Sequence, residues 1–458
     1  MAARLSVVNI FWRYLVTHTR CICKERNTVP IFRKPIVKSC RLHYNRSTDK
    51  LTKRQLKARY KYRFYPTDQQ KQDLARLFGC VRVVWNDALA ICKKSKKVLK
   101  SGDLQKLVIT QAKKTEERKW LSEVSVVPLQ QSVADLGVAF KNFFESHNGK
   151  RKGRKVRSPR FKKRSNNQSA RLTRRGFSIQ GDGVYLAKIG VVKPIWSREL
   201  PSEPSSVTII LDCANNYFLS FVVDIEPVQV DAKNQSIGID LGIKTFAVMS
   251  DGGHVNSPDY SKLDRKLRKQ TRKFARQAKG SNRREQTRIK IARLNNKIAN
   301  KRKDFLHKFS TRIVSENQVI VLEDLNVSGM VKNRKLARAI SQQGWSEFRS
   351  LAQAKSDKYG RDFRVISRWE PTSQICSDCG FKWGKLDLSV RSILCVNCGT
   401  EQDRDINAAR NIEKVGMGHR HDSKWARRGD KTVETVGHAT RTAAHPDDLS
   451  RITVLLGR

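Results

Sequence analysis

Four cysteines in the C-terminal part of the chain have the spacing of a metal site. They form two C-x-x-C pairs, Cys376 with Cys379 and Cys395 with Cys398, and fifteen residues separate the pairs. Four thiolates at this spacing suit a tetrahedral zinc ion, and a glycine after each pair eases the tight turn that such a site needs. A closed thiolate shell leaves no open position, so we expect the zinc to be structural. A redox pair or a chance spacing is the alternative interpretation.

Three acidic residues stand where regular segments of the chain end or begin. Asp240 closes the strand-like residues 237–239, Glu323 closes residues 319–322, and Asp405 falls in the first turn of a helix-like segment. Each acid alone is typical of a turn or a cap. Three converging carboxylates could instead hold two divalent cations, such as Mg²⁺, that activate water for phosphodiester hydrolysis.

The sequence around these acids is similar to the RuvC motifs of the TnpB family. Insertion sequences encode these proteins, which are similar to the compact type V CRISPR effectors. The matching strings are GIDLGIKTFAVMSDG, VIVLEDLNVSGM and DRDINAARNI. PTSQICSDCG followed by CVNCG, and also KDFLHKFST, match the same family. The resemblance covers roughly residues 57–413.

The resemblance implies a role for each acid. Asp240 and Glu323 fall on the first two catalytic acids, and Asp405 falls on the third, with all three as magnesium ligands. Asp403 is the alternative for the third position, and capping of the helix is its other role. Asp324 is a lesser alternative to Glu323. None of the three positions is substituted, so the sequence gives no sign of an inactive nuclease.

The resemblance also implies a function and two partners. The protein would be an RNA-guided DNA endonuclease whose guide RNA comes from the transposon end. Its second partner would be double-stranded target DNA, selected by pairing with the guide. Two other functions stay open: an RNA-guided protein that binds DNA without cutting it, and a transposase that joins DNA, since RNase H-like acids serve that chemistry too.

The charge of the chain indicates a polyanionic partner. Lysine and arginine number 93 against 42 acidic residues, which gives a formal net charge of +51. Nucleic acid is the usual partner of so basic a chain; a membrane surface is the weaker alternative, because no apolar stretch reaches spanning length. A one-sided basic segment is either a solvated linker or a loop that contacts phosphates. Its candidate residues are Lys150, Arg151, Lys152, Arg154, Lys155, Arg160, Lys162, Lys163 and Arg164.

The pattern along the chain predicts a small β domain interrupted by helices, followed by an α/β domain. Alternating aromatic residues predict a strand over 58–65, and hairpins are predicted over 177–191 and 207–223, with residues 184–191 as one strand. Helical stripes lie between the first strand and the hairpins. A strand pair over 236–250, a basic helix over 261–314 broken near Gly280, a strand over 318–322 and a helix over 345–359 complete the pattern.

With the resemblance, this pattern implies a multidomain α/β protein. Its parts would be an RNase H-like (RuvC) nuclease domain with an inserted zinc ribbon, and a small β-barrel domain carrying a helical insertion. The expected segments are a basic extension (1–56), a wedge-like β domain (57–66 and 149–230), a helical recognition domain (67–148), the first part of the RuvC-like domain (231–370), a zinc-ribbon insertion that binds target nucleic acid (371–400), the last RuvC-like part (401–415) and a disordered tail (416–458).

Cysteine usage and the chain ends bear on localisation. The other six cysteines lack ligand spacing, and Cys80 is expected in a helical core, which together favour a reducing interior. We expect a cytoplasmic protein, associated with the nucleoid in a bacterium, or a nuclear or organellar one in a eukaryote. The Arg-rich extension weakly resembles a transit peptide, but a plain basic extension or upstream read-through is the preferred interpretation. His419 and His421 are expected to be surface residues.

Overall fold

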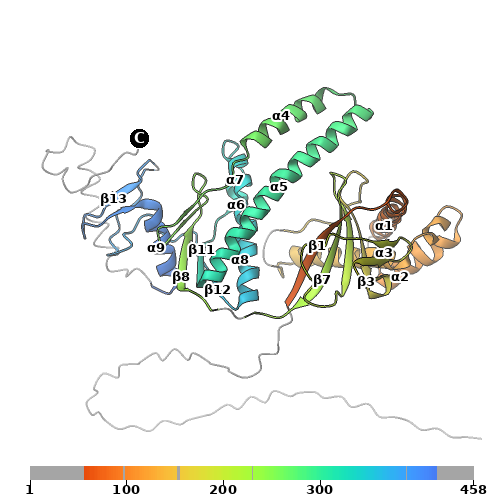
Figure 1. Cartoon of the computed structure of the whole chain (residues 1–458), viewed down its shortest axis with the longest axis horizontal. Helices are drawn as coiled ribbons and strands as arrows, with labels where there is room; N and C mark the ends of the chain where they lie inside the picture. Colours follow the sequence, from red (N-terminus) through yellow and green to blue (C-terminus); the bar gives the residue numbers. More distant parts are fainter. Residues whose placement is uncertain (1–55, 96–97, 152–154, 229–230, 388, 420–458) are drawn as a thin grey trace, which may run out of the picture. The chain divides into compact units, whose positions relative to one another are not determined.

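The structure is a computed structural model that describes residues 56–95, 98–151, 155–228, 231–387 and 389–419 (Figure 1). Almost all of the predicted N-terminal extension, and the predicted tail from residue 420 onward, lie outside this range. Lys152 and Arg154 of the basic segment, and His421, lie outside it as well. Among the helices of the described residues, none has the length and apolar character to span a membrane.

The first sheet joins the early strand to the later hairpin, as the sequence pattern predicted. It has the strand order β1-β7-β6-β2. Strand β1 runs antiparallel to β7, with Tyr60 opposite Phe221. Tyr62 and Phe64 are buried on one side of β1, which explains the alternating aromatic residues. The strands are β1 (Leu56–Phe64), β2 (Gln168–Thr173), β6 (Ser206–Leu211) and β7 (Tyr217–Ile225).

A separate three-stranded sheet corrects one prediction. Residues 184–191 do not form a single strand, because the chain turns between β4 and β5. Lys188 in that turn has a φ of 67°, a left-handed conformation that a continuous strand cannot contain. The strands are β3 (Phe177–Gln180), β4 (Gly183–Leu186) and β5 (Gly190–Val192), with the short η4 (Arg174–Gly176) before them.

The predicted helical insertion between β1 and β2 shares a hydrophobic core with both sheets. Helix α1 begins with a capping box, in which Thr67 and Gln70 each bond the other's backbone N–H. Cys80 is 2% exposed in this core, as expected for a small apolar residue. The helices are α1 (Asp68–Lys94), α2 (Ser101–Gln105), η1 (Lys106–Gln111), η2 (Ala112–Lys114), η3 (Lys119–Ser122) and α3 (Val126–His147).

The second half of the described chain contains a mixed five-stranded sheet of order β10-β9-β8-β11-β12. Strands β8, β11 and β12 are parallel, and β9 returns antiparallel to β8. Because parallel strands end at the same edge, the carboxyl ends of β8 and β11 lie side by side. The strands are β8 (Asn234–Asp240), β9 (Ala247–Met249), β10 (His254–Val255), β11 (Asn317–Glu323) and β12 (Asp362–Ile366).

Alternate residues of β11 pack against different helices. Ile320 and Leu322 join a core with Phe309 of α5 and Phe348 of α8. Val321 and its neighbours pack against Ile412 of α9 instead. This alternation is the period-two pattern of a strand buried on both faces. The helices are α4 (Ser261–Arg276), α5 (Asn282–Glu316), α6 (Val327–Met330), α7 (Ala337–Gln343), α8 (Trp345–Tyr359) and α9 (Arg404–Gly416).

Helix α9 lies very close to the sheet, alongside β8 and β11 (Figure 1). Ala408 and Ala409 are buried at this contact. On the strand side, Gly238 has no room for a side chain, because a Cβ there would collide with the carbonyl oxygen of Ala409 and lie 2.6 Å from the amide nitrogen of Glu413. Small residues on both elements therefore set the separation that positions the first turn of α9. The helix runs through Gly416, one residue into the stretch predicted as tail.

Candidate active site and four-cysteine cluster

The three predicted acids line one pocket. Asp240 ends β8, Glu323 ends β11, and Asp405 lies in the first turn of α9. The strand register pairs Leu322 with Ile239, so Asp240 and Glu323 follow at the same level of neighbouring strands. A pocket of about 570 Å³ opens among them. Its charged lining is Asp240, Glu323, Asp405, Lys244, Arg391 and Arg404.

The electrostatics of this pocket favour a bound cation. Burial, followed by the nearby carboxylates of Asp405 and Glu323, raises the pKa of Asp240 to about 7. Burial also raises the pKa of Glu323. Carboxylates whose ionised forms are disfavoured in this way become stable as anions when a divalent cation joins them. The donor set therefore fits a hard metal ion.

Asp405 already has a cationic partner in this structure. Arg391 Nη1 lies 3.2 Å from Asp405 Oδ2. Arg391 comes from the segment between the two cysteine pairs, so that insertion supplies a positive charge directly to the acidic pocket. A guanidinium at this point can pair with a carboxylate or bind a phosphate oxygen.

The two alternative acids have structural partners of their own. Asp403 Oδ1 accepts hydrogen bonds from the amides of Asp405 at 2.8 Å and Ile406 at 3.0 Å, so it caps α9. Asp324 is held by Arg349 and Arg368 and is absent from the pocket lining. These hydrogen bonds lower the pKa of Asp324. The geometry therefore favours Asp405 over Asp403 and Glu323 over Asp324.

Two buried asparagines that the sequence reasoning missed fix α9 beside the pocket. Asn407 accepts from the Ser377 amide at 2.7 Å and donates to the Ile375 carbonyl at 2.8 Å. Asn411 donates to the carbonyls of Thr372 and Ile375, both at 2.7 Å. The signal was present in the sequence, because two asparagines four residues apart share one helix face and are unusual in a buried stripe.

The four cysteines converge as their spacing predicted. The sulfur atoms of Cys376, Cys379, Cys395 and Cys398 all lie within 4.8 Å of one another. Each pair is followed by a glycine with positive φ, 78° at Gly380 and 74° at Gly399. The amide of each glycine bonds to the carbonyl of the first cysteine of its pair, which closes the tight turn. A side-chain N–H of Gln402 donates to Cys376 Sγ at 3.3 Å. Strands β13 (Ser392–Leu394) and β14 (Glu401–Asp403) flank the second turn.

These distances and turns fit a single tetrahedral metal ion. Four sulfur ligands leave no free position, which is the arrangement of a structural site and not of a catalytic one. In the described part of the chain, these cysteines are the one group of three or more His, Cys, Asp or Glu residues whose ligand atoms lie close enough together to share a metal ion.

The basic segment lies against α1, and one of its residues is used for packing. Lys162 Nζ lies 4.1 Å from the centre of the Trp85 ring, and its backbone amide bonds to Asn86. Burial lowers the pKa of this lysine. Arg151 bonds to Asn142 Oδ1 at 2.7 Å. The remaining described residues of the segment are exposed, namely Lys150, Lys155, Arg160, Lys163 and Arg164.

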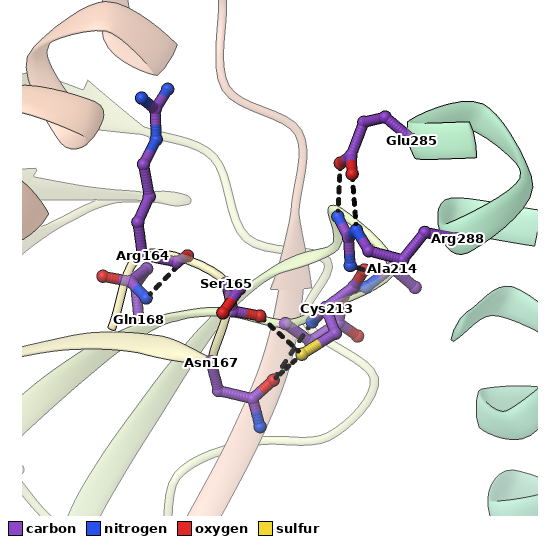
Figure 2. A network of polar contacts seen from close by, with 9 residues as sticks. Arg164, Ser165, Asn167, Gln168, Cys213, Ala214, Glu285 and Arg288 are labelled. Carbon is purple, nitrogen blue, oxygen red and sulfur yellow. Dashed lines mark hydrogen bonds and ion pairs between the residues drawn. The ribbon is translucent and has the colours of Figure 1, made fainter. Parts of the chain in front are cut away.

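A polar network joins the β6–β7 loop to helix α5 (Figure 2). Asn167 Oδ1 accepts from the Cys213 amide at 3.0 Å, and Arg288 donates to the Cys213 carbonyl at 3.3 Å. Arg288 is itself held by Glu285 at 2.7 Å (Figure 2). Cys213 therefore serves a local structural role, in line with its lack of metal-ligand spacing.

The fold and the pocket first define a class. A sheet edge that gathers three carboxylates, next to a four-cysteine insertion before the last helix, fits the nuclease arrangement that the sequence resemblance implied. Comparison with family models shows which families parts of the chain are similar to. Residues 220–334 match the OrfB_IS605 model, described as "Probable transposase", and residues 345–412 match the TNB domain of Cas12f1-like proteins. Residues 56–97 match a helix-turn-helix domain model.

Similar proteins identify the family. A protein of Streptomyces pristinaespiralis, named for an inferred RNA-guided DNA endonuclease activity, is 43% identical over 79% of this chain and 90% of its own length. The similarly named InsQ of Escherichia coli K12 is 32% identical over 78% of this chain and 92% of its own. A solved complex of Cas12f1 with guide RNA and target DNA matches 78% of this chain and 98% of that chain at 12% identity, with a TM-score of 0.46. The chain belongs to the TnpB family.

Proposed function

We propose that this protein is a transposon-associated, RNA-guided endonuclease that hydrolyses DNA at the pocket of Asp240, Glu323 and Asp405. The observation that carries the proposal is the convergence of these carboxylates from β8, β11 and α9 on one pocket. The names of the two relatives described above support the reaction and the RNA guide.

The three carboxylates would hold two magnesium ions, one to activate the attacking water and one to stabilise the leaving oxygen. When bound, magnesium would lower the pKa of the attacking water and stabilise the charge on the scissile phosphate. Water oxygen would bond to phosphorus while the bond to the 3′-oxygen breaks, and that oxygen would take up a proton. Lys244, Arg391 and Arg404 line the pocket and would bind the phosphate oxygens of the strand.

The four cysteines would hold one structural zinc ion. In this role zinc would fix the insertion that carries Arg391, and so place that side chain at the pocket. The Gln402 N–H bond to Cys376 Sγ would stabilise the negative thiolate. Metal analysis of the purified protein should give about one zinc per chain. Cys379→Ser should lower that content, whereas Cys92→Ala, a buried cysteine outside the cluster, should not.

The remaining segments would bind the guide and the target. Guide RNA derived from the transposon end would bind the two β-sheets, which would form a wedge-like barrel (57–66 and 149–230). It would also bind the exposed basic residues between positions 150 and 164. The helical insertion (67–148) would read the duplex beside the target, and residues 371–400 would contact the target nucleic acid. The RuvC-like parts would be residues 231–370 and 401–415.

Sequencing and reprogramming the co-purifying RNA tests this function. We expect the purified protein to carry one RNA species whose variable end can be replaced. A plasmid matching the new guide should then be cut in Mg²⁺, and the original target should be spared. Tight target binding without cutting would support the non-cleaving alternative. Joined DNA products formed without RNA would support the transposase alternative.

A further inference from the structure

Trp369 exposes almost its whole side chain to solvent. Its exposed fraction is 87%, against 67% for Tyr65, the next most exposed large apolar residue among the described ones. Within the described part of the chain, the indole has no ring contact and no side-chain hydrogen bond. Single exposed apolar residues are common, but an indole this bare is a large apolar area left without a partner.

The backbone that carries Trp369 is nevertheless well fixed. The amide of Glu370 bonds to the carbonyl of Ser367 at 3.2 Å, and the amide of Thr372 bonds to the carbonyl of Glu370 at 2.9 Å. The amide of Trp369 itself lies 3.3 Å from Ser367 Oγ. These hydrogen bonds fix the backbone that presents the ring, so a ligand has to order only the side chain.

Both ends of this turn are attached to the rim of the acidic pocket. On one side, Ile366 of β12 pairs with Glu323, and Arg368 binds Asp324, the residue after Glu323. On the other side, the turn leads into Thr372, which lines the pocket. Trp369 thus lies three positions along the chain from Thr372 of the pocket wall, on a segment that starts beside one of the acids.

The chemistry of this position suits a nucleobase. An indole face stacks on any base regardless of sequence, and aromatic residues beside positive charge are the usual means of holding a single strand. The cations that line the pocket, Arg391 and Arg404, suit the phosphates of the same strand. We propose that Trp369 stacks on a base of the DNA strand entering the pocket and so positions the adjacent phosphodiester for cleavage.

This inference rests on the proposed function, and its test separates the two. Guide-bound complexes of wild type, Trp369→Leu and Trp369→Phe would be given guide-matched DNA carrying 5-iodouracil at one position at a time, in Ca²⁺ to slow cutting. After irradiation, mass spectrometry identifies the crosslinked peptide. The same complexes would then be assayed for cleavage rate in Mg²⁺ on unmodified DNA.

We expect a DNA crosslink on Trp369 that Trp369→Leu loses. Trp369→Leu should also cut about 10-fold more slowly, and Trp369→Phe should recover most of the rate because it still stacks. Equal cleavage rates for wild type and Trp369→Leu would overturn the inference, as would the absence of a DNA crosslink on Trp369 at every labelled position. Absence of any cleavage by wild type would instead overturn the proposed function, while the crosslink would still report on the base contact.

Discussion

At the scale of single residues, burial and the nearby carboxylates disfavour the ionised form of Asp240. Asp240 is largely enclosed, and the carboxylates of Asp405 and Glu323 add like charge to the effect of burial. The pKa of Asp240 is accordingly raised to about 7. In the metal-free protein this carboxyl group is therefore about half protonated near pH 7, and its ionisation costs stability.

The stability of the metal-free protein should therefore depend on pH through Asp240. The carboxyl group of an aspartate in the unfolded chain has a pKa of about 4. The free-energy cost of ionising Asp240 in the folded protein is therefore absent below that pH, grows as the pH rises toward about 7 and is complete above it. Asp240→Asn removes the cost. In excess chelator, the variant should melt at about the same temperature as wild type at pH 4 and be more stable than wild type by on the order of 4 kcal/mol at pH 8. Equal melting temperatures at pH 8 would contradict the assigned pKa.

Substitutions of Asp403 and Asp405 should have different effects on cleavage and stability, although the two residues are only two positions apart. Asp403→Ser keeps a side-chain cap and should leave cleavage within about 3-fold of wild type, whereas Asp403→Ala should cost about 1 kcal/mol of stability. Asp405→Asn should lower the cleavage rate on the order of 1,000-fold with an unchanged melting temperature. Single-turnover cleavage and thermal melting of the four proteins check this. Retention of activity by Asp405→Asn together with its loss in Asp403→Ser would reverse the assignment.

At the scale of elements, the site depends on a close contact between α9 and β8. The strands themselves were predictable from local patterns, because apolar residues at 237 and 239 of β8 and at 319–322 of β11 precede the acid that ends each strand. The docking of α9 was only partly predictable. Small residues such as Ala408 and Ala409 permit a close approach. The bonds of Asn407 and Asn411 to a loop some thirty to forty residues earlier, however, are long-range contacts that no local pattern encodes.

Gly238 should be the most sensitive point of this contact. Gly238→Ala would place a Cβ against the Ala409 carbonyl, so α9 must shift and carry Asp405 with it. We expect a loss of about 1–3 kcal/mol in the free energy of unfolding and a cleavage rate reduced at least about 10-fold. The control is Gly79→Ala in α1, where no atom lies within 4 Å of the new Cβ. It should be neutral or stabilising by up to about 1 kcal/mol. Equal behaviour of both variants in urea unfolding would contradict the packing argument.

At the scale of the whole molecule, positive charge is the dominant property. The net charge of +51 was sufficient to predict a nucleic-acid partner. The structure shows which basic side chains are exposed to solvent and which pack against the protein. Helix α4 has no buried residue and is strongly basic, whereas Lys162 packs on Trp85. Sequence counts could not make that distinction, because exposure depends on what each side chain packs against.

The salt dependence of guide-RNA affinity should distinguish exposed basic side chains from those that pack against the protein. Removing exposed lysines or arginines that contact phosphate lowers the slope of log affinity against log salt by about 0.7 per contact for single-stranded nucleic acid. The double variant Lys163→Ala with Arg164→Ala should therefore lower the slope for guide RNA by about 1 to 2. Lys162→Met should leave it unchanged. Filter-binding measurements at several salt concentrations test this, and an equal loss in Lys162→Met would show that its ammonium group contacts RNA.

The most direct measurement of the central claim is cleavage of a guide-matched plasmid in Mg²⁺ by wild type and Asp240→Ala. Both complexes should hold the same guide RNA and bind the plasmid equally well. We expect wild type to linearise the plasmid and Asp240→Ala to be slower on the order of 1,000-fold or more. Undiminished cleavage by Asp240→Ala would contradict the assignment of this pocket as the active site.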